Sequence, residues 1–353
     1  MHKSARIKAF VDFELRNNAV VVQKCSSLFE KLQQNVTNEY KKFHNSRKPK
    51  INNLQIDAEI TNVTVDDTAY LSNPKLIEAF SQFKVNQELP FSITQELRGE
   101  SQSNMFSDVL FPEQHFLKTL YFVNSSFSRE SFHQIQRHHK IWWMKYGANP
   151  GKYSISDQKT EAFSKFVNIR SNVSDSPMDV ERLKFFSLKD CIKDKEVLKN
   201  FLCRAPNRKK ETVPDVIESV VDMQIASFAL LTDAVNLSDD YTAFHRRSAP
   251  FQIALIVKGP SKDLIELARY IELLVNATDP NIAVLNEANI SEHDELTQHY
   301  QKYDDIGIPY AIVLEPTALE SGMFKLRNRN TTLLETIHLS DVSSYLVKIF
   351  NSA

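Results

Sequence analysis

The chain has 353 residues, of which 42% are hydrophobic and 25% are charged, as in a globular protein with room for two or three domains. Its 43 lysines and arginines nearly balance its 44 aspartates and glutamates, which excludes a surface that is basic throughout. Only 6 residues are glycine, although glycine makes up about 7% of an average chain. So little glycine argues against nucleotide chemistry in a loop that approaches a phosphate closely.

The three cysteines do not have the spacing of a metal site. Cys191 and Cys203 lie twelve residues apart, and no second pair of ligands accompanies them. We therefore expect no structural metal, no disulfide framework and a reducing compartment. No run of eighteen apolar residues occurs, so we expect no membrane span. The basic residues at the extreme N-terminus are either the remnant of an import sequence or part of a charged first helix.

Positive charge gathers in two parts of an otherwise near-neutral chain. Residues 1–50 carry 11 lysines and arginines against 4 acids, and residues 182–210 carry 10 against 3. By contrast, residues 51–244 as a whole carry 22 basic and 26 acidic side chains, and residues 245–353 carry 10 and 14. Two such islands are typical of local contact with a polyanion, although two solvated helical faces would give the same counts.

In the first two thirds of the chain, some segments predict secondary structure clearly and others do not. Residues 10–45 show a helical pattern, whereas residues 51–105 are rich in Asn and Gln and indicate no clear element. Trp142 and Trp143 favour an extended segment in which they face opposite sides, the alternative being that one or both anchor a core. Residues 153–190 predict antiparallel strands, and residues 213–235 predict a central strand followed by a buried helix.

The last third predicts a compact α/β domain with a mixed sheet. Residues 251–257 form an apolar strand, after which Ser261 caps a helix that Pro280 stops. The further elements expected are strands at 282–285, 309–314, 323–326 and 332–338, and helices at 291–303 and from 340 onwards. The order is therefore β-α-β-α-β-β-β-α.

No pattern of catalytic residues rises above chance. Arg98-Gly99-Glu100 has a spacing that some ATP-binding enzymes use, but a pattern of three residues occurs too often by chance to identify such an enzyme. The segment 138–140, His-His-Lys, is more consistent with a solvated basic turn than with acid–base catalysis. The paired acids at 239–240 and 304–305 would point to opposite faces of a strand and not share a magnesium ion. We therefore expect no catalytic residue, no metal and no cofactor.

Several segments in the second half resemble class II aminoacyl-tRNA synthetases of the glycyl type. Residues 212–219, Thr-Val-Pro-Asp-Val-Ile-Glu-Ser, resemble the start of their third signature motif. Residues 249–251, 305–307 and 326–331 resemble their anticodon-binding domain in the same order. The positions that hold ATP in the active enzymes are similar to Asp222, Gln224 and Ile225 here. An acid and an apolar residue at these places oppose triphosphate binding, so the resemblance implies that the synthetase chemistry is lost.

A synthetase-like fold without its chemistry is found in the accessory subunits of mitochondrial DNA polymerase gamma. Residues 141–153, with Ile-Trp-Trp-Met at their start, are similar to a segment of the insect members, as are residues 327–346. The resemblance covers residues 106–353 well and residues 1–105 only loosely. Asn330 stands where the family usually has Asp, so a salt bridge made there would be absent. Vertebrate members carry an inserted helical bundle that makes them dimers, and this chain is too short there to hold it, which favours a monomer.

The resemblance implies a fold of the α+β and α/β classes. A degenerate class II synthetase-like antiparallel sheet domain would be followed by an anticodon-binding-like α/β domain with a mixed five-stranded sheet. The expected division is an N-terminal helical or irregular region at 1–105, partly joined to the middle domain, a synthetase-like domain at 106–244 and an anticodon-binding-like domain at 245–353.

The resemblance also implies a non-catalytic processivity subunit of the mitochondrial replicative DNA polymerase, placed in the matrix nucleoid. Its partners would be the catalytic polymerase subunit and double-stranded primer-template DNA, with no membrane. The residues expected at DNA phosphates are Lys41, Lys42, Arg47 and Lys48 in the first island, and Arg204, Arg208, Lys209 and Lys210 in the second. Arg327 and Arg329 are expected to contact the polymerase subunit, unless one of them closes a salt bridge within the domain, for example to Glu335. The alternative function is a synthetase relative that binds tRNA.

Overall fold

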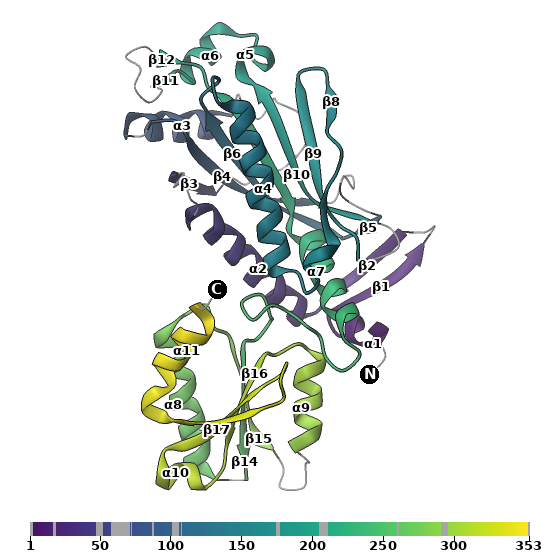
Figure 1. The fold of residues 1–353 in the computed structure, drawn as a ribbon, viewed down its shortest axis with the longest axis vertical. Coiled ribbons are helices and arrows are strands. Elements are labelled where there is room, and N and C mark those ends of the chain that lie inside the picture. Colours follow the sequence, from purple (N-terminus) through teal and green to yellow (C-terminus); the bar gives the residue numbers. More distant parts are fainter. Residues whose placement is uncertain are drawn as a thin grey trace.

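The structure, a computed structural model, divides into two lobes, each built on its own sheet (Figure 1). The upper lobe holds an eight-stranded sheet, and the lower lobe holds a five-stranded sheet formed by the last third of the chain. The residues that the structure describes are 3–16, 19–46, 52–57, 71, 73–86, 88–100, 106, 108–173, 177–204, 211–259, 261–290 and 296–351.

The N-terminal segment begins with a short helix and a hairpin. Helix α1 (Lys3–Lys8) leads into strands β1 (Val11–Arg16) and β2 (Ala19–Cys25), which form a small sheet with β5 (Val109–Leu110). The prediction of a helix throughout residues 10–45 was therefore wrong in its first half, because the β-branched run at 20–22 favours a strand. It is confirmed in its second half by α2 (Ser27–Ser46).

The large sheet is antiparallel apart from one edge pair. Its order is β3-β4-β6-β13-β10-β9-β7, with β8 paired to β9, and only β3 and β4 run parallel. The strands are β3 (Asn52–Asp57), β4 (Phe91–Glu100), β6 (Glu113–Val123), β7 (Tyr153–Ile155), β8 (Lys159–Glu161), β9 (Ser164–Ser171), β10 (Met178–Ser187) and β13 (Asp215–Asp222). This sheet confirms the expected synthetase-like class and the strands predicted at 153–190. Because β3 and β4 lie in the same sheet as the later strands, the division at residue 105 stays a prediction.

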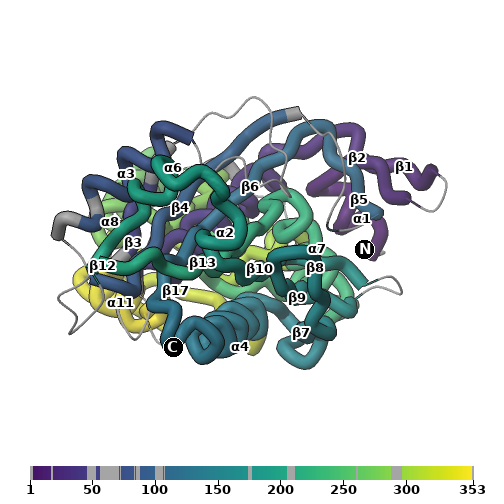
Figure 2. The backbone as a smooth tube through the Cα atoms, turned by 90° about the horizontal axis from the view of Figure 1, so that it is seen from above, coloured from purple at the N-terminus to yellow at the C-terminus, as the bar shows by residue number. Residues whose placement is uncertain are grey.

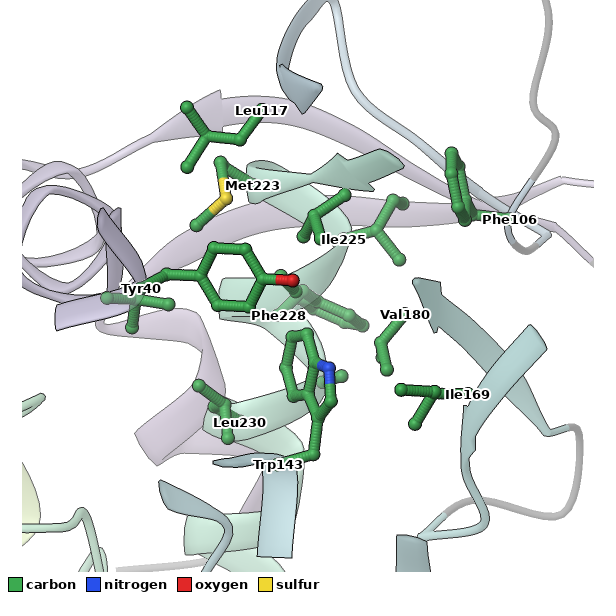
Figure 3. Packing of buried hydrophobic residues seen from close by; sticks show 14 of the residues in the cluster. Tyr40, Phe106, Leu117, Trp143, Ile169, Val180, Met223, Ile225, Phe228 and Leu230 are labelled. Atoms are coloured by element: carbon green, nitrogen blue, oxygen red, sulfur yellow. The ribbon is translucent and has the colours of Figure 1, made fainter. Parts of the chain in front are cut away.

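Helices cover both faces of this sheet. Helices α2, α4 (Ser128–Tyr146) and α7 (Met223–Leu237) pack on one face, where Tyr40, Trp143 and Phe228 meet in the main core (Figure 3). Helices α3 (Pro74–Asn86), α5 (Leu188–Cys191) and α6 (Lys195–Asn200) cover part of the other face through a second apolar cluster. In the view from above in Figure 2, α3 lies at the upper left and α4 lies at the lower edge. The remaining short elements are η2 (Pro150–Lys152) and a hairpin of β11 (Cys203–Arg204) and β12 (Glu211–Thr212).

The two tryptophans lie in a helix and not in an extended segment. In α4 the buried positions Phe132, Ile135, His139, Trp142 and Tyr146 recur three or four residues apart, which gives the helix one stripe that faces the core. Trp142 and Trp143 are both buried, so the alternative that they anchor the core is confirmed. The prediction of a solvated turn at 138–140 was also wrong, since His139 is fully buried.

The lower lobe has the predicted mixed five-stranded sheet, in the order β15-β14-β16-β17-β18. Strands β14, β15 and β16 are parallel, and β17 and β18 add two antiparallel strands at one edge. Ser261 caps α8 as expected, its hydroxyl accepting a hydrogen bond from the backbone of Leu264. The short helix α10 was not predicted, and the second strand begins two residues later than expected. The elements are β14 (Ile253–Lys258), α8 (Lys262–Thr278), β15 (Val284–Ile290), α9 (Leu296–Asp305), β16 (Tyr310–Leu314), α10 (Thr317–Ser321), β17 (Met323–Asn328), β18 (Leu334–His338), η3 (Leu339–Asp341) and α11 (Val342–Asn351).

Helices α8, α10 and α11 cover one face of this sheet, and α9 covers part of the other. Among the described residues, no helix combines the length and the apolar character needed to cross a bilayer.

Candidate nucleic-acid and polymerase interfaces

The N-terminus of α7, where the synthetase resemblance would place a triphosphate, is closed by its own side chains. Asp222 caps the helix, and its Oδ1 accepts hydrogen bonds from the backbone N–H groups of Gln224 and Ile225 at 2.9 and 3.1 Å. Gln224 Oε1 accepts a hydrogen bond from the backbone of His115 at 2.7 Å, and Ile225 packs in the core. The donors that would hold a phosphate are therefore already used within the chain.

Asp222 adds an electrostatic obstacle at the same point. Burial raises the pKa of its carboxyl to about 7, against the opposing effect of the two helix N–H groups. Near neutral pH the position therefore holds a carboxyl group that is in part negatively charged, and a second anion beside it would be repelled. The side chains of Asp222 and Gln224 thus occupy the helix end, while the side chain of Ile225 packs in the core.

A buried polar network ties α2 and α4 to the sheet. Glu181 of β10 lies at its centre: its Oε1 accepts from Ser219 Oγ at 2.6 Å and from His139 Nδ1 at 2.5 Å, and its Oε2 accepts from Trp143 Nε1 at 2.8 Å. The other nitrogen of His139 lies 2.9 Å from the hydroxyl of Tyr121, which in turn lies 2.6 Å from Nδ1 of His44 in α2. A single chain of hydrogen bonds therefore links α2 and α4 with strands β6, β10 and β13.

The partners of Glu181 determine its charge. Burial alone would raise the pKa of this carboxyl, but the charge and hydrogen bond of His139, together with Ser219 and Trp143, outweigh burial and lower the pKa. Glu181 is therefore ionised in the folded protein at neutral pH although it is fully buried.

The first basic island lies at the end of α2, and its described members are engaged with acids. Lys41 pairs with Glu96 of β4, and its side chain is one quarter exposed. Lys42 Nζ lies 2.7 Å from Glu39 Oε1, and its side chain is 46% exposed. Arg47 and Lys48 lie outside the described residues. Of the two described lysines, Lys42 is the more accessible to a phosphate.

Glu96 is the acid around which this region is organised. Its burial would raise its pKa, but hydrogen bonds from Lys41 and Arg98 and the charges of Lys41 and His115 lower the pKa to about 2. Lys41, Arg98 and His115 thus surround one carboxylate that stays ionised. Burial lowers the pKa of His115, so Lys41 and Arg98 are the cations of this cluster at neutral pH.

The second island lies around the β11–β12 hairpin. Arg204 is exposed at the end of β11, and its backbone pairs with Glu211 of β12. Arg208, Lys209 and Lys210 lie outside the described residues. Ser125, which precedes α4, donates from its hydroxyl to the backbone of Val213 at 3.4 Å, so this hairpin lies at the same end of the molecule as the start of α4.

The structure gives Arg327 an internal partner. Its two terminal nitrogens donate to the two carboxylate oxygens of Asp304 at 2.8 and 2.7 Å, and its guanidinium stacks 4.5 Å from the centre of the Tyr300 ring. Glu335 was the wrong choice of partner, because it lies opposite Leu326 in the hairpin and therefore faces the other side of the sheet. Arg327 is 8% exposed, so little of it is open to a partner protein.

Arg329 is also internal, and it holds the linker between the lobes. Its guanidinium donates to the backbone oxygens of Thr242, Gly307 and Phe244 at 2.7 to 3.1 Å, and to Asn330 Oδ1 at 3.0 and 3.1 Å. All five of its donors are thus satisfied. Burial lowers the pKa of this guanidinium to about 10, although the charge of Asp304 favours its protonated form. A contact of either arginine with the polymerase subunit stays a prediction, and it would have to act through the loop that they position.

Sequence reasoning missed one basic surface, which is the outer face of α4. Arg129, His133 and Arg137 are spaced four residues apart on the side opposite the buried stripe. This spacing is visible in the sequence. It was not recognised as helical because residues 137–143 were predicted to be extended.

Comparison with known proteins identifies the family. The chain is 30% identical over 265 residues to the mitochondrial DNA polymerase subunit gamma-2 of Drosophila melanogaster, and the alignment covers 71% of each chain. The chain belongs to the DNA polymerase subunit gamma-2 family. The family resemblance seen in the sequence is therefore confirmed.

Members from vertebrates match over a smaller share of their own length. The mouse subunit gamma-2 is 26% identical over 291 residues, covering 76% of this chain and 62% of the mouse protein. A family model described as an anticodon binding domain matches residues 282–349. The glycine–tRNA ligase of Borreliella afzelii is 28% identical over 147 residues, covering 39% of this chain and 31% of the ligase. These matches confirm the synthetase-like relation of the gamma-2 family member described here.

Proposed function

We propose that this gamma-2 family member is a non-catalytic processivity subunit of the mitochondrial replicative DNA polymerase, which binds the catalytic subunit and duplex DNA in the mitochondrial matrix. The observation that carries the proposal is the 30% identity to the Drosophila subunit over 71% of both chains. The closure of the α7 N-terminus by Asp222 supports a role without ATP chemistry.

Duplex DNA would be held by contacts with its phosphates and not by reading of its bases. Lys41, Lys42 and Arg204 are the described members of the two islands, and Arg47, Lys48, Arg208, Lys209 and Lys210 complete them in the sequence. Contacts of this kind are insensitive to base sequence, and each one makes the affinity fall with salt by roughly 0.9 log unit per log unit.

The catalytic subunit would bind the lower lobe, whose acidic balance is less suited to a broad grip on nucleic acid. The loop after β17 is the expected contact. Arg327 and Arg329 lie at the start of this loop and fix it against Asp304 and the linker backbone. Replacing both arginines by alanine is expected to weaken binding of the polymerase subunit by about 2 kcal/mol or more and to leave duplex binding near normal, measured under conditions in which the variant is folded.

The proposal is tested by primer extension with the catalytic subunit, in the presence of a trap that captures released enzyme. Adding the chain should lengthen the products made in one binding event, and gel filtration should show a complex of the two proteins. Reversing the charge of Arg204, Arg208, Lys209 and Lys210 should lower duplex affinity and flatten its salt dependence. Product lengths that do not change on addition of the chain would refute the proposal.

The rival function is tRNA binding by a synthetase relative, which the anticodon-binding match at 282–349 favours. A tRNA that competes with duplex DNA at equal or lower concentration would support this rival. For either function we expect no ATP–pyrophosphate exchange with any amino acid, because Asp222, Gln224 and Ile225 close the helix end. Exchange above a buffer control would contradict the non-catalytic assignment.

A further inference from the structure

The outer face of α4 carries more positive charge than its neighbours can balance. Arg129 and Arg137 are exposed on this face, and Lys140 is half-buried at its edge. Within the described part of the chain, no ion pair involves any of these three side chains, whereas Lys41, Lys42 and Arg327 each have an acid. The acid of the same helix, Glu130, accepts a hydrogen bond from Gln134 instead.

A concavity of about 900 Å³ lies along the first half of this helix. Two arginines and one acid, Arg129, Arg137 and Glu130, line it together with His133, Gln134, His138 and the serine-rich segment 125–128, so the fixed cations outnumber the acid there. The first N–H groups of α4 also lie here without a side-chain cap, and their partial positive charge adds to that of the arginines. The concavity is therefore a place where positive potential is concentrated.

The opposite face of the helix is held rigidly. His139 and Trp143 bond to Glu181, and Tyr146 donates to Glu39 of α2 at 2.6 Å. Because these contacts are buried, the backbone positions that carry the outer cations are fixed before any ligand binds. Charges on a rigid helix lose less backbone entropy on binding than the same charges on a flexible loop would.

We propose that the outer face of α4, through Arg129, Arg137 and Lys140, is a further surface for the phosphate backbone of duplex DNA. This inference rests on the proposed function, and it adds a third site to the two islands recognised in the sequence. The start of α4 lies at the same end of the molecule as the β11–β12 hairpin, which carries Arg204 (Figure 1).

The dimensions of the helix fit a backbone contact. With a rise of about 1.5 Å per residue, Arg129 and Arg137 are separated by about 12 Å, and Arg129 and Lys140 by about 16.5 Å along the axis. Duplex DNA carries one phosphate charge per about 1.7 Å of its axis, so phosphates outnumber the cations over this length and the three cations can neutralise two or three of them.

The chemistry of this face favours DNA over an acidic protein. The core of a protein interface is depleted of charge and enriched in aromatic residues. Between residues 128 and 140, the exposed side chains are charged or polar, and the exposed large apolar side chains Phe127 and Ile141 lie only at the two ends. A row of cations without an apolar centre matches phosphate.

The test compares the triple variant R129A/R137A/K140A with the unmodified chain. Duplex binding is measured by fluorescence anisotropy over a range of KCl concentrations. The log–log slope should become shallower by roughly 0.9 for each phosphate that the variant no longer neutralises, which is about 1.8 to 2.7 for two or three phosphates. The matched control is K262A/R269A/K348A, which removes the same charge from exposed helical positions of the lower lobe that make no ion pair in the described structure. The variant R129K/R137K keeps the charge and should keep the slope.

The outcomes separate this inference from the proposed function. If the unmodified chain does not bind duplex DNA, both are overturned. If it binds and the α4 triple variant keeps its slope, only the α4 surface is overturned, and the same holds if the control variant flattens the slope equally. If the α4 variant loses the catalytic subunit while its DNA binding is unchanged, the face is a protein interface and the inference is wrong. Thermal unfolding of each variant shows that the fold is retained, as expected for exposed positions.

Discussion

Removal of the Glu181 carboxylate should be among the most destabilising single changes in the upper lobe. Glu181→Ala leaves three buried donors, on His139, Ser219 and Trp143, without their acceptor. All three are buried, and the hydroxyl of Tyr40, which lies 3.1 Å from His139 Nδ1 and 3.4 Å from Ser219 Oγ, can replace only part of what Glu181 provides. The change should therefore loosen both helices that the network holds against the sheet.

The magnitude follows from these hydrogen bonds. Each buried group left without a partner costs about 1–3 kcal/mol, and part of this is offset because a charge no longer has to be desolvated. Breaking a buried, hydrogen-bonded charge pair by removing one member typically costs about 3–5 kcal/mol. We therefore expect Glu181→Ala to lower the free energy of unfolding by about 3–5 kcal/mol.

Urea unfolding followed by tryptophan fluorescence is a suitable assay, because both tryptophans lie in α4. Glu196→Ala is the matched control: its carboxylate forms an exposed pair with Lys199, and its removal should cost less than about 1 kcal/mol. A loss below about 1 kcal/mol for Glu181→Ala would refute the reasoning, because the network would then contribute no more than a surface pair.

The pH dependence gives a second check on the same residue. The folded protein holds the pKa of Glu181 below its ordinary value, so the unfolded chain takes up the proton first as the pH falls. This part of the stability is present above the unfolded pKa of about 4.3 and is lost as the pH falls through the lower folded pKa. The variant Glu181→Gln should lack this component, and its stability should change less between pH 6 and pH 3.

Three further predictions concern other buried groups. Arg327→Ala should lower the free energy of unfolding of the lower lobe by about 3–5 kcal/mol, measured by thermal unfolding, because the carboxylate of Asp304 would stay buried without its partner. Asn330→Asp should raise stability by about 1 kcal/mol, since it places a negative charge beside the Arg329 guanidinium, and a lower unfolding temperature would contradict this. Because the pKa of Asp222 is raised to about 7, the folded state binds its proton more tightly than the unfolded state, so stability falls as the pH rises from about 4 to about 7. Asp222→Asn should remove this fall while keeping the helix cap, and equal pH profiles of the two proteins in urea unfolding would show that Asp222 does not titrate there.

The lower lobe could be predicted largely from the sequence, because its signals are local. Apolar runs of strand length, the cap at Ser261 and helical spacing in α8 each depend on residues close together in the chain. The sequence did not predict which residues far apart in the chain would contact each other. Arg327 meets Asp304 across 23 residues, and the choice between Asp304 and Glu335 depends on which face of the sheet each residue occupies. Only the register of the hairpin determines that.

The prediction of an extended segment where α4 lies was wrong for a similar reason. A histidine in an otherwise apolar stripe breaks the pattern, and the sequence cannot show that His139 is satisfied by Glu181, 42 residues further on. Once the His139–Glu181 pair is known, the buried positions of α4 are seen to recur every three or four residues. The exposed cations then lie on the opposite face of the helix. Burial of a polar residue by a distant partner is thus what concealed both the helix and its basic face.

Helix α4 therefore combines two roles on opposite faces, and these roles should separate by mutation. Its inner face bonds to Glu181 and is expected to determine stability, whereas its outer face carries Arg129 and Arg137 in solvent and is proposed to contribute to DNA affinity. Variants of the inner face should change the free energy of unfolding and leave the salt dependence of duplex binding alone, as long as the measurement is made where the protein is folded. Variants of the outer face should do the reverse, because exposed cations without ion pairs add little to stability.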